Sequence, residues 1–103
     1  MEEEFEVYKQ AIKINPDDAK AHYDLGLAYG ESIKWKKAIK SYKQAVRINP
    51  DFAEAHYFLG GAYVFSEDRG GALEQYKILK KLDTELANEL FSLIAEGNRV
   101  ALD

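Results

Sequence analysis

Two histidines are the residues of this 103-residue chain best suited to bind a metal ion or to transfer a proton. His22 and His56 occupy matching Ala-His-Tyr segments, neither has a second histidine at helical ligand spacing, and the chain contains no cysteine. Equivalent residues of successive helical repeats lie about 10 Å apart, which is too far to share one ion. We therefore expect packing or hydrogen-bonding roles for both histidines, and no metal site.

Carboxylate pairs and glycine pairs offer no stronger sign of catalysis. Asp24 with Glu31, and Glu67 with Asp68, are available carboxylates, but acid–base chemistry needs a sheltered cleft and nothing in the sequence marks these residues as buried. The two Gly-Gly pairs lack the lysine and the preceding strand of a phosphate-binding loop. We expect a non-catalytic protein without a cofactor.

Composition narrows the class of protein. Lys and Arg number 14 against 18 Asp and Glu, and this net charge of −4 argues against a dedicated nucleic-acid binder. The length fits one domain or a short run of repeats, and 47% hydrophobic with 31% charged residues is typical of a folded, soluble chain. Met1 to Glu6 lack the basic start and apolar run of a signal peptide, and no apolar stretch approaches the roughly 20 residues of a membrane span. Together with the absence of cysteine, this favours the cytoplasm and no membrane association.

A repeat of 34 residues organises the chain. Residues 19–29 return with close similarity as residues 53–63, and two parts of 8–17 return in 42–51 at the same offset. Leu25, Ala28 and Tyr29 follow the i, i+3, i+4 spacing of an amphipathic helix. The Asn-Pro pairs at 15–16 and 49–50 end helices, since proline disfavours helical geometry in the residue before it.

Each unit is therefore expected to be helix, turn, helix, turn. The predicted helices, without any strand, span 3–14, 18–31, 35–48, 52–65, 69–81 and 84–101. Asp51 and Glu54 have the spacing of a capping box, and Thr84 is the expected N-cap of the last helix. The Gly70-Gly71 pair is expected to loosen the start of the fifth helix.

These residues resemble the tetratricopeptide repeat family, whose 34-residue signature has a large residue, Leu-Gly, Tyr, Ala, an aromatic residue and Pro in order. In the first unit these positions hold His22, Leu25-Gly26, Tyr29, Ala38, Tyr42 and Pro50. In the second unit they hold His56, Leu59-Gly60, Tyr63, Ala72 and Tyr76, with Thr84 in place of proline. The resemblance implies an all-α fold, a right-handed superhelical stack of antiparallel helix pairs.

The resemblance also implies how the chain divides. We expect one domain over 1–103, made of a half repeat with only its second helix (1–18), two repeats (19–52 and 53–86) and a C-terminal capping helix (87–103). The first helix then lacks a preceding partner for its apolar residues, which are Phe5, Tyr8, Ala11 and Ile12. We expect an excised part of a longer array, with formation of homo-oligomers through this uncapped helix as a consequence.

Members of this family usually bind extended peptides on the concave wall, which the first helix of each repeat supplies. Carried over by position, the peptide-binding groove consists of Lys20, Tyr23, Asp24, Leu27, Glu31, Glu54, Tyr57, Phe58, Val64 and Phe65. Smaller or more distant members are Gly30, Gly61, Asn88, Phe91, Ala95 and Asn98. The resemblance implies a protein-interaction scaffold that binds a peptide or partner helix through an aromatic groove with an acidic rim.

Two alternatives stay open beside groove binding. The chain could be a structural segment of a longer solenoid or a self-assembling unit. A basic stripe on the expected convex wall, formed by Lys36, Lys40, Lys43 and Arg47, could instead bind an acidic protein or RNA.

The sequence argues against one class of partner, the acidic C-terminal tails of heat-shock chaperones. Relatives that bind the acidic C-terminal tails of heat-shock chaperones use a clamp of lysine, arginine and asparagine on the concave wall. The matching positions here are Tyr23, Leu27, Glu54 and Phe58, which supply no cation for a carboxylate. We expect no binding to such tails.

Overall fold

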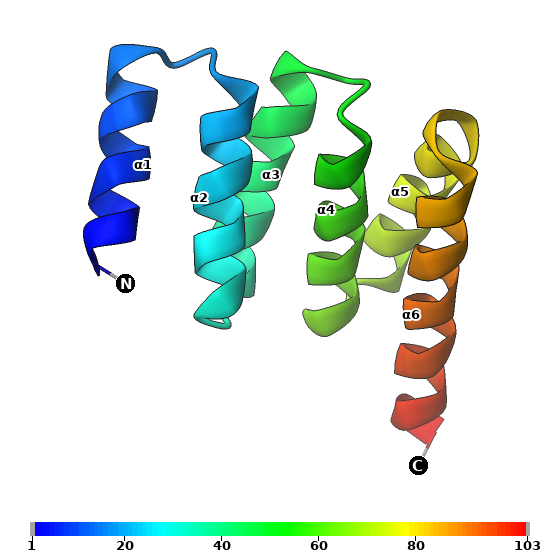
Figure 1. Ribbon diagram of the computed structural model, residues 1–103. Helices are drawn as coiled ribbons and strands as arrows, with labels where there is room; N and C mark the ends of the chain where they lie inside the picture. The colour runs from blue at the N-terminus through cyan, green and yellow to red at the C-terminus, as the bar shows by residue number, and fades with distance from the viewer. Residues whose placement is uncertain (1, 103) are drawn as a thin grey trace.

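The computed structural model of the chain describes the backbone of residues 2–102 and the side chains of residues 3–97, and this part is all helical (Figure 1). The helices are α1 (Glu2–Ile14), α2 (Ala19–Glu31), α3 (Trp35–Ile48), α4 (Ala53–Phe65), α5 (Arg69–Leu82) and α6 (Thr84–Leu102). Consecutive helices are antiparallel, and every predicted helix is present within one residue at each end. The all-α solenoid predicted from the repeat is confirmed.

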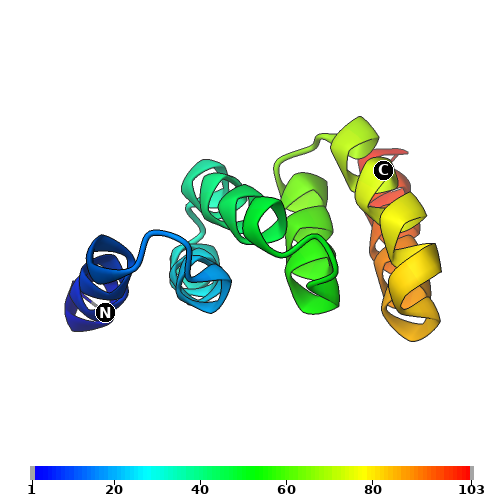
Figure 2. The same cartoon turned by 90° about the horizontal axis from the view of Figure 1, so that it is seen from above.

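The helices lie in two layers (Figure 2). The helices that begin each pair, α2, α4 and α6, form one layer, and α3 and α5 form the other. In the first layer α2 contacts α4 and α4 contacts α6, whereas α3 and α5 do not touch each other within the described chain. Since neighbours are closer in the α2–α4–α6 layer, the stack curves with this layer on its concave side, as the repeat predicts.

Three aspartates cap helix starts, because their carboxylates accept hydrogen bonds from otherwise unpaired backbone N–H groups. Asp18 accepts from Ala21 at 3.1 Å, Asp68 from Gly71 at 2.9 Å and Asp83 from Leu86 at 3.1 Å. Asp83 also ends α5, so one residue separates α5 from α6.

Two capping predictions are wrong. The N-cap residue of α4 is Phe52, which makes no side-chain cap, so Asp51 and Glu54 form no capping box. Instead the backbone N–H of Asp51 donates to the side-chain oxygen of Asn49 at 3.2 Å, inside the preceding turn. At α6 the cap is Asp83, and Thr84 is already the first helical residue.

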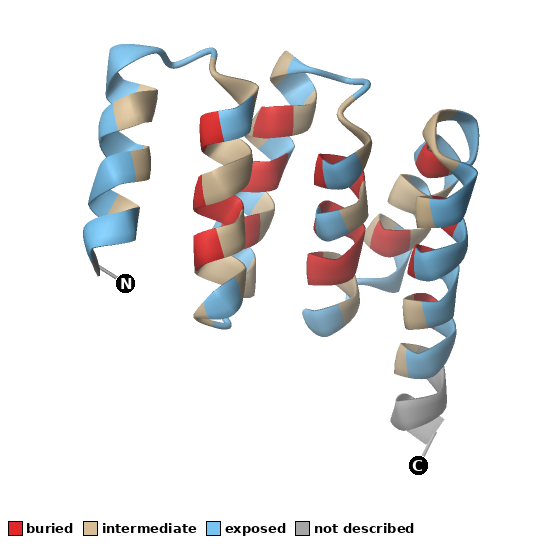
Figure 3. Cartoon of the chain, viewed as in Figure 1, coloured by how far each residue is buried: buried red, intermediate tan, exposed pale blue. Residues whose placement is uncertain are grey.

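Buried residues are concentrated in α2 to α6 and not in α1 (Figure 3), and small residues among them allow the two layers to approach closely. Ala38 and Ala72 are fully buried at equivalent positions of α3 and α5. A Cβ atom on Gly26 would meet the ring of Tyr42, with Cδ1 at 2.6 Å. A Cβ atom on Gly71 would lie 2.8 Å from the ring of Tyr63. Gly71 is therefore a packing residue in a close contact between α5 and α4, rather than only a weak start of α5.

The core is continuous along the stack but thin at its first helix. One cluster of buried side chains joins α3 and α4, and a second joins α5 and α6. Among residues 3–14 no side chain is fully buried, and α1 contacts only α2. Val7 and Ile14 of α1 are 63% and 83% exposed. None of the helices, over the described residues, is long and apolar enough to cross a bilayer.

Candidate protein-binding face

The ten residues predicted to line the groove come from α2 and α4, in the concave layer. The exposed members are Lys20, Glu31, Glu54, Phe58 and Phe65. The half-buried members are Tyr23, Asp24, Leu27, Tyr57 and Val64. On α6, Asn88, Phe91 and Ala95 are exposed, and the side chain of Asn98 lies outside the described residues. We call this set of side chains on α2, α4 and α6 the concave face.

Aromatic rings form a continuous contact chain on the concave face. The ring of Phe58 lies 5.9 Å from that of Tyr23 on α2 and 5.1 Å from that of Tyr57 on its own helix. Tyr23 also contacts Phe52, with ring centroids 4.8 Å apart. Offset and edge-on contacts of this kind favour a fixed ring arrangement. Phe58 remains 38% exposed, so the chain of rings presents apolar area to solvent.

A second aromatic contact lies at the C-terminal end of α4. Phe65 is 57% exposed on one side, and its other side stacks on Trp35 at 5.0 Å with an interplanar angle of 16°. Trp35 begins α3 and lies 3.5 Å from where a Cβ atom of Gly30 would be. Trp35 thus supports both the α2–α3 turn and Phe65, and the repeat spacing did not indicate its contact with Phe65.

Four predicted groove residues also pack against the core. Tyr23 and Leu27 pack against the buried cluster around Tyr42, and Tyr57 and Val64 pack against the cluster of α5 and α6. Val64 lies so close to α6 that a Cβ atom on Gly97 would be 3.1 Å from its methyl group. Only part of each of these side chains remains for a ligand, whereas Phe58, Phe65 and Phe91 are exposed.

Carboxylates surround the tyrosines of this face. Burial raises the pKa of the Tyr23 hydroxyl, and the charges of Glu54 and Asp24 raise it further. Burial likewise raises the pKa of Tyr57, with Glu89 of α6 adding to the effect. The ammonium group of Lys20 pairs with Asp24 at 3.2 Å on its own helix, so it compensates Asp24 rather than Glu54.

The opposite layer is basic. All four residues of the predicted stripe (Lys36, Lys40, Lys43 and Arg47) are exposed on α3, and Arg47 donates to the side-chain oxygen of Gln44 at 3.0 Å. The helix has no acidic residue. Lys77 and Lys81 continue the stripe on α5 at the same repeat positions as Lys43 and Arg47. This continuation was missed from the sequence, although the 34-residue offset contained the signal.

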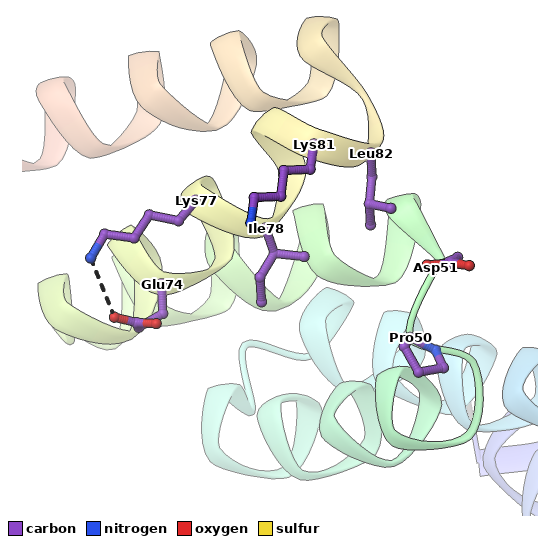
Figure 4. Close-up of a pocket in the computed structure, with 7 residues that line it drawn as sticks. All are labelled: Pro50, Asp51, Glu74, Lys77, Ile78, Lys81 and Leu82. Carbon is purple, nitrogen blue, oxygen red and sulfur yellow. Dashed lines mark ion pairs between the residues drawn. The ribbon is translucent and has the colours of Figure 1, made fainter.

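A hollow of about 240 Å³ lies on the α5 side of the molecule, away from the concave face (Figure 4). It is lined by Pro50, Asp51, Glu74, Lys77, Ile78, Lys81 and Leu82. Its charges are mixed, and Lys77 pairs with Glu74 at 3.6 Å. The hollow is a gap between the α3–α4 connection and α5, with no polar group left buried and unpaired among the described residues.

The histidines have the hydrogen-bonding role that the sequence predicts. The Nε2 atom of His22 lies 2.9 Å from the carbonyl oxygen of Pro16, and that of His56 lies 2.7 Å from the carbonyl oxygen of Pro50. His56 is buried and also contacts the side-chain amide of Gln75 at 2.7 Å. Each histidine therefore ties its helix to the preceding Asn-Pro turn. Over the described residues, no group of three or more metal-ligating side chains is found.

Comparisons with known proteins agree with this arrangement. A family model described as TPR repeat matches residues 5–32 and 34–64. Among solved structures, the chain superposes on "TPR2B-domain:pHsp70-complex of yeast Sti1" with a TM-score of 0.82 and 22% identity, covering 92% of this chain and 80% of the other. It superposes on "Crystal structure of MamA" with a TM-score of 0.75 and 20% identity, covering 95% and 68%. No curated protein matches the sequence. The repeat signature, the paired helices and the matching family model show that the chain belongs to the tetratricopeptide repeat family.

Proposed function

We propose that the chain is a protein-interaction scaffold that binds a segment of another protein on its concave face. The observation that carries this proposal is the exposure of Phe58 and Phe65 on α4, with the half-buried rings of Tyr23 and Tyr57 in contact with Phe58. Exposed rings held side by side on rigid helices offer contact area at little entropic cost. The yeast Sti1 domain of the same fold was solved as a complex with pHsp70, which supports a protein ligand for this fold.

Within this proposal the chain acts as one domain. Residues 1–18 form a half repeat, 19–52 and 53–86 the two repeats that build the concave face, and 87–103 the capping helix. The two repeats bring the rings of α2 and α4 together, and the capping helix adds the exposed ring of Phe91, which contacts Tyr76 of α5.

A random dodecapeptide display library, selected on the purified chain, tests the proposal. Recovered peptides are expected to lose binding to Phe58→Ala, because the central ring of the aromatic chain is removed. They are expected to bind Lys40→Glu normally, since Lys40 is exposed on the other layer. Binders that depend on Lys40 and ignore Phe58 would instead support the basic stripe as the binding surface. Recovery of no Phe58-dependent peptide would refute the proposed function.

Assembly through α1 is a second candidate function. Val7 and Ile14 are exposed on a helix that contacts only α2. Their repeat equivalents on α3 are Ser41, which is buried, and Ile48, which is half-buried. A second copy would cover the α1 positions. Light scattering across a dilution series should then show a mass that rises with concentration in the wild type and stays monomeric in Val7→Glu. A strictly monomeric wild type at high concentration would exclude this candidate.

A further inference from the structure

One aromatic ring recurs at the same position of every helix in the concave layer. Tyr23, Tyr57 and Phe91 are separated by 34 residues each, and they lie on α2, α4 and α6. Phe58 connects the first two, with ring contacts to both. Axes of packed helices lie about 8–10 Å apart, so Tyr23 and Tyr57 form a ladder with a step of roughly that size. The ring of Phe91 lies against Tyr76 of α5, with ring centroids 5.5 Å apart.

Negative charge accompanies the ladder. Glu54 and Asp24 lie near enough to the Tyr23 hydroxyl to raise its pKa in addition to burial, and Glu89 acts in the same way on Tyr57. The three helices of this layer together carry more acidic than basic residues, and α4 has Glu54 as its sole charge. The layer that carries the rings is therefore net negative.

Elsewhere in the molecule, lysines of the chain itself lie over half-buried rings. Lys37 lies over Tyr29 at 5.8 Å from the ring centroid, and Lys80 lies over Tyr76 at 5.6 Å. No described lysine or arginine covers Tyr23, Tyr57 or Phe58, and the nearest cation on α2, Lys20, is paired with Asp24. The half-buried rings of Tyr23 and Tyr57 and the exposed ring of Phe58 are thus left without a cation of the chain's own, while Glu54 and Glu89 are exposed on the same layer.

We infer that the partner segment carries arginine or lysine side chains that lie against the rings of Tyr23 and Tyr57. A cation over a ring face is attracted by the ring quadrupole, and an adjacent carboxylate adds charge pairing. An acidic segment would meet Glu54 and Glu89 without a compensating cation. A neutral segment would leave both carboxylates unpaired.

The ladder also sets a spacing. An extended chain rises about 3.3 Å per residue, so rings about 8–10 Å apart match cations three residues apart. The expected recognition pattern is therefore a basic residue, two others, and a second basic residue, with apolar side chains against Phe58. This inference rests on the proposed function, because it names the chemistry of the segment bound at that face.

The composition of the selected dodecapeptides tests it. Peptides that require Phe58 should contain Arg and Lys at least twice as often as the unselected library, preferentially three positions apart, and should be depleted in Asp and Glu. Phe58-dependent peptides of neutral or acidic composition would overturn the inference while leaving the proposed function intact. Failure to recover any Phe58-dependent peptide would overturn both.

Variants then locate the effect. For one synthetic peptide from the selection, replacing each basic residue by Gln should weaken binding about two- to fivefold. Tyr57→Leu keeps an apolar side chain but removes one of the two rings, so it should reduce the difference between the basic peptide and its Gln counterpart. Glu54→Gln should weaken the basic peptide more than the Gln counterpart.

Glu74→Gln is the matched control, because Glu74 is an exposed carboxylate on α5, outside the concave layer. Glu74→Gln should change neither the affinity for the basic peptide nor the affinity for its Gln counterpart. An equal loss in Glu74→Gln and Glu54→Gln would show attraction to the overall charge of the protein and contradict a site at the rings. Circular dichroism spectra that match the wild type establish that each variant is folded.

Discussion

At the scale of single residues, the glycines of α2 have unequal roles. Gly26 faces the ring of Tyr42, which is almost fully buried and has no free space behind it. Gly30, one turn later, would place a Cβ atom 3.5 Å from Trp35 and 3.6 Å from the Tyr42 hydroxyl, which is ordinary contact. The same substitution should therefore have opposite effects at the two positions.

Gly26→Ala is expected to lower the free energy of unfolding by about 1–3 kcal/mol, because the ring of Tyr42 must move or α2 must shift. Gly30→Ala is expected to be neutral or to raise it by up to about 1 kcal/mol, since alanine is the better helix former. Urea unfolding followed by circular dichroism measures both. A Gly26→Ala protein as stable as the wild type would show that the two helices separate at no cost.

The turns within each helix pair contain a strained residue. Ile33 and Glu67 are equivalent in the repeat and have φ angles of 58° and 64°, in the left-handed region. For the β-branched Ile33 this conformation is unfavourable, and its side chain is 72% exposed, so packing does not compensate.

Ile33→Gly should therefore raise the free energy of unfolding by up to about 1 kcal/mol, as glycine adopts this conformation without a steric cost. Glu67→Gly at the equivalent turn should show a smaller gain, since glutamate is unbranched at Cβ. Thermal and urea unfolding curves provide the measurement. A clear loss of stability in Ile33→Gly would mean that the isoleucine makes a contact worth more than the strain.

At the scale of helices, the repeat made the fold predictable. The apolar spacing, the Asn-Pro pairs and the 34-residue offset together placed all six helices to within one residue. The capping residues were less predictable, because an aspartate before a helix does not always accept a hydrogen bond from the first turn of that helix. The carboxylates of Asp18 and Asp83 cap α2 and α6, whereas Asp51 does not cap α4. Close approaches such as Gly71 to Tyr63 depend on which residues face each other across helices, which no local pattern contains.

The candidate site was predictable to the same extent. Position in the repeat identified the concave layer, so the rings of Tyr23, Tyr57 and Phe58 were expected there. Which of them touch, and that Phe65 stacks on Trp35, follows from side-chain directions that the spacing does not determine. The partial burial of Leu27 and Val64 has the same origin, because both positions lie at the border between the face and the core.

The helices should differ in local stability. α1 contacts a single neighbour and its described side chains are at most half-buried, whereas α4 contacts helices on both sides and carries six buried residues. Few buried contacts permit local opening without global unfolding. In native-state hydrogen exchange, the amides of α1 should exchange fastest among the helices before α6, and those of α4 should approach the global rate.

Phe5 offers a way to test this difference, since it joins α1 to α2 through the ring of Tyr29 at 5.0 Å. Phe5→Ala should accelerate exchange in α1 and leave α4 unchanged. Equal protection of α1 and α4 in the dilute wild type would contradict the ranking, and protection of α1 that increases with protein concentration would indicate that a second copy covers it.

At the scale of the whole molecule, charge is divided between the two layers. α3 and α5 carry nine basic residues between them and one acidic residue, Glu74, whereas the helices of the concave layer carry a net negative charge. The net charge of −4 conceals this separation, because many of the acidic residues lie in α1 and the turns. A charged partner is therefore attracted to one layer and repelled by the other, and this difference is reduced by salt.

The division of charge predicts how peptides with the acidic tail of a chaperone interact with each of the two layers. A peptide with the acidic C-terminal sequence of a heat-shock chaperone should not saturate the concave face at micromolar concentrations in a fluorescence titration. The positions that a carboxylate clamp needs hold Tyr23, Leu27, Glu54 and Phe58, and Glu54 adds repulsion. Any weak attraction at low salt should come from the basic layer, disappear near 0.15 M salt, where the Debye length is about 8 Å, and be reduced by Lys40→Glu. The expectation is contradicted if the peptide saturates the protein at micromolar concentration at this salt concentration, with the same affinity in Lys40→Glu and no binding to Phe58→Ala. That result would show that the concave face binds acidic tails without a cationic clamp.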